Sequence, residues 1–247
     1  MNILLYVVLF IIGIGTGVFC QVAIYRIPRN IKIMKKGVTN IEPEGKQKIS
    51  KKIIKISYEI LIGILFVLFG KALGIDINSL KLSQIIMYVF TIVYLTILFI
   101  IAGIDKKHIN IDKKVTTFGV IVSMIYIVYS YTIDPSSIYF NTVCLGLYII
   151  LLVVDTIFLR KYAQNSYTIG MLMLFNMMLV FSEVEIFAYT IVITAIGILL
   201  YLLKLKINQK NNGNKKVKID NVPVGYFLSI SNIIILCASA ITQIVQV

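Results

Sequence analysis

Long apolar stretches, separated by short polar ones, make up most of the chain. Each stretch has about the 17–25 residues that a helix needs to cross a bilayer core. The stretches are continuously apolar rather than alternating, and backbone groups in lipid must be paired within their own segment, so they predict helices. We expect spans at residues 3–25, 53–73, 84–104, 115–132, 137–158, 166–182, 184–203 and 223–245. The sequence therefore predicts an all-α polytopic membrane protein with about eight transmembrane helices, and residues 1–247 as a single membrane domain.

Composition supports this class. Of the 247 residues, 59% are hydrophobic and 14% are charged, whereas soluble domains are roughly 45–50% apolar and about 25% charged. This excludes a soluble enzyme, a disordered chain and a disulfide-stapled secreted domain.

The first stretch has no basic residues before it and no small-residue cleavage site after it, so we expect a span and not a cleavable signal peptide.

The charges predict an orientation. Of the 24 Lys and Arg residues, all but Lys71 and Lys81 lie in four connections, at residues 26–55, 105–114, 159–165 and 204–222. Eight spans put these four connections on one side, which the positive-inside rule assigns to the cytoplasm. We therefore expect a multi-pass plasma-membrane protein with both termini outside, a basic cytoplasmic loop at 26–55 and a basic cytoplasmic linker at 204–222. The positive-inside distribution explains the net charge of +13. We therefore expect the lipid bilayer as a partner and no nucleic acid.

Four acidic residues lie in or beside the predicted spans: Glu59, Asp105, Asp112 and Asp155. Ionisable groups at membrane depth are costly and indicate function, although each could instead pair with a nearby Lys or Arg at the interface. Two carboxylates that share one proton can activate water, one as base and one as acid. The chain has one histidine, His108, and three separate cysteines, so we expect no metal site and no cofactor.

Three blocks of sequence resemble the type IV prepilin peptidases. Residues 17–28, GVFCQVAIYRIP, resemble the N-terminal signature GSFLNVVIYRLP. Residues 104–112, IDKKHINID, resemble the IDxxHxxIPD block, whose first Asp, here Asp105, is catalytic in that family. Residues 222–228, VPVGYFL, are similar to the segment IPFGPFL. The resemblance covers nearly the whole chain and implies an integral membrane aspartic endopeptidase that removes the basic leader of prepilins and pseudopilins at the cytoplasmic face, for pilus assembly or protein secretion.

The chain departs from the family pattern at the second catalytic position. The family has an Asp in a GxGD motif at the start of the sixth span, where residues 162–170 read YAQNSYTIG and Tyr167 or Thr168 takes that place. Either the protein is a degenerate member that binds prepilin-like segments without cutting them, or Asp155 serves as the second acid. The 26–55 loop lacks the four zinc-binding cysteines of many members and is short, which argues against the methyl transfer that many members also perform.

Three functions stay open at this stage. The first is a prepilin-peptidase-like aspartic endopeptidase with Asp105 and Asp155 as its acids, and the second is a non-catalytic prepilin-binding or assembly protein of the same fold. The third is a small transporter, which would predict inverted repeats and spans broken by Gly and Pro. The four prolines all lie in loops or at span ends, which disfavours the third.

Overall fold

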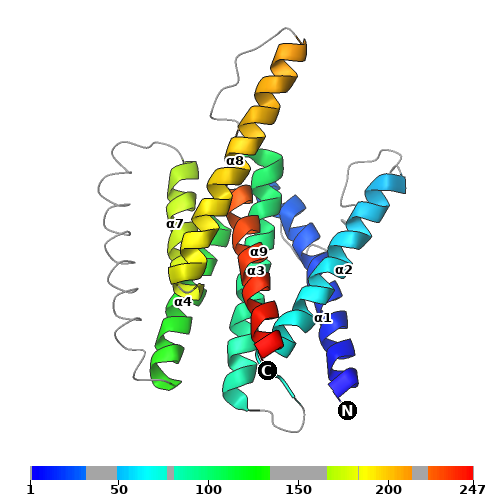
Figure 1. The fold of residues 1–247 in the computed structure, drawn as a ribbon, viewed down its shortest axis with the longest axis vertical. Coiled ribbons are helices and arrows are strands. Elements are labelled where there is room, and N and C mark those ends of the chain that lie inside the picture. The colour runs from blue at the N-terminus through cyan, green and yellow to red at the C-terminus, as the bar shows by residue number, and fades with distance from the viewer. Residues whose placement is uncertain are drawn as a thin grey trace. The chain divides into compact units, whose positions relative to one another are not determined.

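A computed structural model describes residues 2–31, 49–76, 81–133, 166–182, 184–212 and 222–246. Within these residues every regular element is helical, as Figure 1 shows, which confirms the predicted all-α class for that part of the chain. The helices are α1 (Asn2–Arg26), the short 3₁₀ helix η1 (Ile27–Arg29), α2 (Ile49–Ala72), α3 (Leu82–His108), α4 (Lys113–Ile133), α7 (Ser166–Phe181), α8 (Val184–Asn212) and α9 (Val224–Gln246).

Five of the described helices are long and apolar enough to cross a membrane. They are α1 with η1, α3, α4, α8 and α9, whereas α7 contributes a shorter apolar segment, Ile169–Phe181. The chain is therefore a helical membrane protein. Seven of the eight predicted spans coincide with described helices, and the remaining one, at 137–158, lies outside the described residues. The count of eight spans stays a prediction.

Two predicted connections are shorter than expected. Helix α2 already begins at Ile49 and α8 continues to Asn212, so parts of the 26–55 loop and of the 204–222 linker are helical. Hydropathy marks where a helix leaves the apolar layer, not where it ends. Lysine and glutamine have good helix propensity, so a helix continues into water at little cost.

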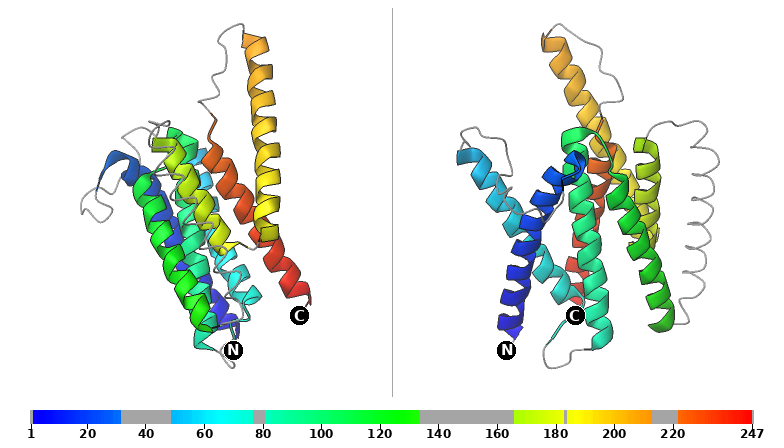
Figure 2. Two further views of the ribbon diagram at one scale, coloured as in Figure 1. Left: turned by 90° about the vertical axis from the view of Figure 1, so that its left-hand side faces the viewer. Right: turned by 180° about the vertical axis from the view of Figure 1, so that it is seen from behind.

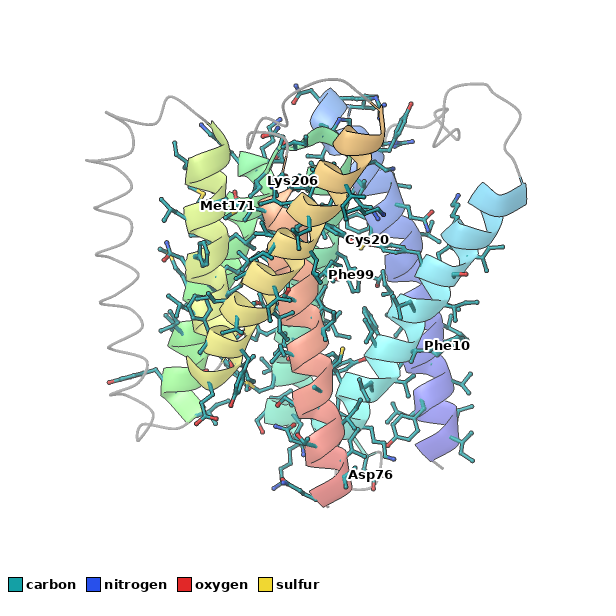
Figure 3. The ribbon with its side chains drawn as sticks, turned by 45° about the horizontal axis from the view of Figure 1, so that its top comes forward. Phe10, Cys20, Asp76, Phe99, Met171 and Lys206 are labelled. Carbon is teal, nitrogen blue, oxygen red and sulfur yellow. The ribbon has the colours of Figure 1, made fainter. Side chains whose placement is uncertain are left out.

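The chain divides into two compact units, Met1–Ile100 with Leu236–Val247, and Ile101–Ile235. In the first unit α1 packs against α2 (Figure 2). A Cβ atom on Gly13 would stand 2.7 Å from the Cα of Gly63, and a Cβ on Gly63 would stand 2.8 Å from the ring of Phe10. Small residues allow such close backbone approach between membrane helices. Figure 3 labels Phe10 and Cys20, which lie at different levels of α1.

In the second unit, aromatic contacts join successive helices. The rings of Tyr126 and Phe181 pair α4 with α7 at 4.7 Å between centroids, and those of Phe175 and Phe187 pair α7 with α8 at 6.1 Å. The rings of Tyr201 and Phe227 pair α8 with α9 at 5.4 Å. Because α7 and α8 run in opposite directions, the start of α7 near Met171 and the end of α8 near Lys206 lie toward the same side of this unit (Figure 3).

Candidate functional site

Asp105 lies in the last turn of α3 and is fully buried, with no part of its surface exposed. Its Oδ2 accepts a hydrogen bond of 2.8 Å from the backbone N–H of Tyr226, which is 121 residues further along the chain. Tyr226 is the third residue of α9, and the first four N–H groups of a helix have no partner within the helix. Asp105 therefore acts as a capping group supplied by another helix, and its carboxylate lies at the positive end of the α9 dipole.

Gly225 makes this approach sterically feasible. A Cβ atom at this position would stand 3.1 Å from Asp105 Oδ2 and 2.8 Å from Ile111 Cδ1. Both distances are too short for an unstrained contact, so the carboxylate and the isoleucine occupy the space that a larger residue would need. The second and third sequence blocks, at 104–112 and 222–228, are thus in direct contact.

Ile111 connects a third helix to the same place. It is fully buried, and a Cβ on Gly170 of α7 would stand 2.8 Å from its Cβ and Cγ2 atoms. The start of α7 and the start of α9 therefore both pack on Ile111. Tyr167 and Thr168, which take the place of the family's second Asp, belong to the first turn of α7. The other predicted acid, Asp155, lies outside the described residues, so its pairing with Asp105 stays a prediction.

Asp112 has a local structural role. Its Oδ1 accepts hydrogen bonds from the backbone N–H groups of Lys114, at 2.9 Å, and Val115, at 3.4 Å. Since α4 begins at Lys113, Asp112 is the N-cap residue of that helix, a position where Asp is strongly preferred. This accounts for one of the four candidate acids without assigning it any chemistry.

The residues after Asp105 bring α3 to its end. Ile109 has a positive φ of 48°, and its N–H donates to the Asp105 carbonyl at 2.8 Å. Such a left-handed residue commonly terminates a helix. His108 is exposed, and Lys106 lies over the Tyr226 ring with its Nζ 4.9 Å from the centroid. Lys106 thus adds a cation–π contact between the same two helices.

The first sequence block has a packing role in the other unit. A Cβ on Gly17 would stand 2.9 Å from the Cα of Glu59, and the Gln21 side-chain amide donates to the Lys55 carbonyl at 3.0 Å. Cys20, between them, is fully buried. Gly17 and Gln21 therefore fix α1 against α2, and Glu59 lies at this contact, where it is half-buried.

Sequence reasoning identified Asp105 but missed the groups that hold it. It did not predict the hydrogen bond from the Tyr226 backbone N–H. It also did not predict that Gly225 and Ile111 would pack together beside the carboxylate. The available signal was Pro223 and, two residues later, Gly225 at the start of an apolar stretch, because proline is typical of the start of a helix, where N–H groups have no partner within the helix. Among the described residues, no group of three or more His, Cys, Asp or Glu side chains could hold a metal ion.

Comparison with known proteins gives no independent guide to function: no family model, no curated protein and no solved structure matches the chain. The class of the protein therefore rests on its helices, which define an integral membrane protein.

Proposed function

We propose that this chain is a prepilin-peptidase-like integral membrane protein whose substrate-binding centre surrounds Asp105. The observation that carries the proposal is the contact of Asp105 Oδ2 with the Tyr226 N–H at 2.8 Å. It joins two sequence blocks that both resemble the same family and that are far apart along the chain. A buried carboxylate is costly to place in a membrane protein, so its position where these two blocks meet supports a functional centre.

In the proposed reaction, Asp105 and Asp155 act as the pair of acids in hydrolysis of a leader peptide. Asp105 Oδ2 is a hydrogen-bond acceptor at a helix N-terminus, which suits the base that takes a proton from the attacking water. Asp155 would be the acid that gives a proton to the leaving amine nitrogen. The substrate class is a prepilin or pseudopilin, bound at the cytoplasmic face of the plasma membrane, with both termini of the chain outside.

A second candidate function is a non-catalytic binding or assembly protein of the same type. The burial of Asp105 and its bond to a backbone N–H favour it, because a carboxylate that ties α3 to α9 already has a structural role. Tyr167 or Thr168 in place of the family's second Asp also favours it, since a hydroxyl is a poor general base near neutral pH.

Leader removal in membranes distinguishes the two candidates. The chain is co-expressed with a prepilin-type substrate, and cleavage is scored for the wild type, Asp105→Asn and Asp155→Asn, with Asp112→Asn as the matched control. Asparagine is also a good N-cap, so the control should cut at the wild-type rate. For a peptidase, Asp105→Asn and Asp155→Asn should each abolish cleavage while the protein still accumulates in the membrane.

The result that contradicts the peptidase is a wild type that binds the substrate in cross-linking experiments but never shortens it. Such binding supports the assembly protein. Absence of both cleavage and cross-linking contradicts both candidates.

A further inference from the structure

A polar stripe runs along α9 from the candidate site, within the second unit. Gly225, Ser229 and Asn232 are spaced i, i+4 and i+7, which places them on one face of the helix. Gly225 is the residue that packs beside Asp105. At 1.5 Å per residue, the stripe descends about 10 Å from Gly225 to Asn232. The stripe therefore extends from the level of Asp105 toward the middle of α9, which is mostly apolar.

Helix α8 carries a matching stripe at Thr190, Thr194 and Gly197, again at i, i+4 and i+7. One contact joins the two stripes, and a second shows that α8 and α9 run beside each other in opposite directions. The Asn232 side-chain amide donates to Thr190 Oγ1 at 3.1 Å, and a Cβ on Gly197 would stand 3.1 Å from the Phe227 ring. Thr194 is one turn from Thr190 on the same face of α8, and Ser229 is about one turn from Asn232 on the same face of α9. Both hydroxyl groups therefore lie on the two faces that meet at the Asn232–Thr190 contact.

These two hydroxyl groups differ from those of several other Ser and Thr residues in the described helices. Ser and Thr in an apolar helix usually donate to the carbonyl of residue i−4, as Ser123 does to Gly119 at 2.8 Å and Thr190 does to Ile186 at 2.7 Å. Thr194 Oγ1 and Ser229 Oγ are buried and have no hydrogen-bond partner anywhere in the described part of the chain. Both amide atoms of Asn176, a fully buried residue of α7, are also without one there.

We propose that water molecules are bound along the α8–α9 interface, from Asn232 past Thr194 and Ser229 to the level of Asp105. Buried polar groups in native proteins are paired, and internal water is the usual partner where the protein supplies none. The hydroxyl groups of Thr194 and Ser229 can each donate one hydrogen bond and accept others. They therefore suit water, which is neutral and also both donates and accepts hydrogen bonds. This hydrated path goes beyond the proposed function, because it exists whether or not Asp105 hydrolyses a peptide bond.

Thiol reactivity tests the path without reference to cleavage. Cys20, Cys144 and Cys237 are replaced by alanine, and Ser229→Cys is compared with Leu228→Cys, which changes an adjacent, equally buried apolar residue. Silver ion, which is small and travels through water, is the probe, and free thiol is measured by mass after unfolding. Because thiol reactivity follows access to water, Ser229→Cys should react at least about tenfold faster than Leu228→Cys. Equal, slow reaction at both positions would overturn the proposal.

Thermal stability provides a second test if the cysteine variant folds poorly. Thr194→Val keeps the shape of the side chain and removes its hydroxyl group. If that hydroxyl binds water, the substitution leaves the water short of a partner, and Tm should fall. If the hydroxyl is buried without any partner, its removal relieves a desolvation cost and Tm should rise, which contradicts the proposal. Thr190→Val is the reference, since it removes the observed bond from Asn232 and should lower Tm in both cases.

Discussion

At the scale of single residues, the site depends on a residue without a side chain. Gly225 lies against both Asp105 and Ile111, and the carboxylate reaches the Tyr226 N–H only because the space above Gly225 is open. The acid and its hydrogen-bond donor are therefore coupled through steric packing. A change at Gly225 should affect the site as strongly as a change at Asp105 itself.

We expect Gly225→Ala to destabilise the protein by about 1–3 kcal/mol, the usual cost of overpacking. The new Cβ would stand 2.8 Å from Ile111 Cδ1, so Ile111→Val, which removes that atom, should restore part of the loss in the double variant. Unfolding in detergent measures all three variants as a double-mutant cycle.

Gly15→Ala is the control for the glycine replacement, because a Cβ there meets nothing within 4 Å. It should leave stability unchanged or raise it slightly. Additive effects of Gly225→Ala and Ile111→Val would mean that the two residues are not in contact.

The sequence predicted individual residues unequally. Asp105 stood out because an acid at the end of an apolar stretch is rare, and the structure buries it fully. Asp112 seemed equally informative, yet its carboxylate only caps α4. The bond from Tyr226 could not be predicted, since it joins residues 121 positions apart and no local pattern encodes which helices become neighbours.

At the scale of helices, apolar length predicted where the described helices lie but not where they end. The α2 and α8 helices extend into their basic connections, because helix propensity continues after hydropathy falls. The distance between two packed helices depends on where their glycines lie, and a hydropathy pattern does not predict that distance. The α1–α2 contact at Gly13 and Gly63 is the clearest case.

We therefore expect Gly63→Val to separate α1 from α2. Its side chain would enter the space of the Phe10 ring, 2.8 Å from the glycine's hypothetical Cβ, and the Phe10 carbonyl, 3.1 Å away. Since a backbone carbonyl cannot move aside as a side chain can, the loss should exceed about 2 kcal/mol. The measurement is the temperature at which the purified protein loses its monodisperse peak in size-exclusion chromatography.

Gly197→Val is the matched comparison. The three atoms nearest to a Cβ at this position all belong to the Phe227 ring, the closest at 3.1 Å, and a ring can shift by a few tenths of an ångström. It should cost less than Gly63→Val. Equal losses would mean that the carbonyl of Phe10 does not limit the α1–α2 distance.

At the scale of the whole molecule, the distribution of charge and the direction of α3 together decide whether the proposed function is feasible. Leader cleavage at the cytoplasmic face requires the end of α3 that carries Asp105 to be cytoplasmic. The positive-inside rule assigns that side from the basic residues near His108, and the opposite end of α3 begins next to Lys81. Because a residue at each end of α3 is exposed, labelling the two ends can show whether α3 crosses the membrane and which end is cytoplasmic.

We expect Lys81→Cys and His108→Cys, each in the background without native cysteines, to label from opposite sides. Both positions are exposed. In right-side-out membrane vesicles, a membrane-impermeant maleimide should modify Lys81→Cys at once and His108→Cys only after permeabilisation. Labelling of both from the outside would mean that α3 does not cross the membrane. The reverse order would put Asp105, three residues before His108, on the external side, and a cytoplasmic leader peptide could then not reach it.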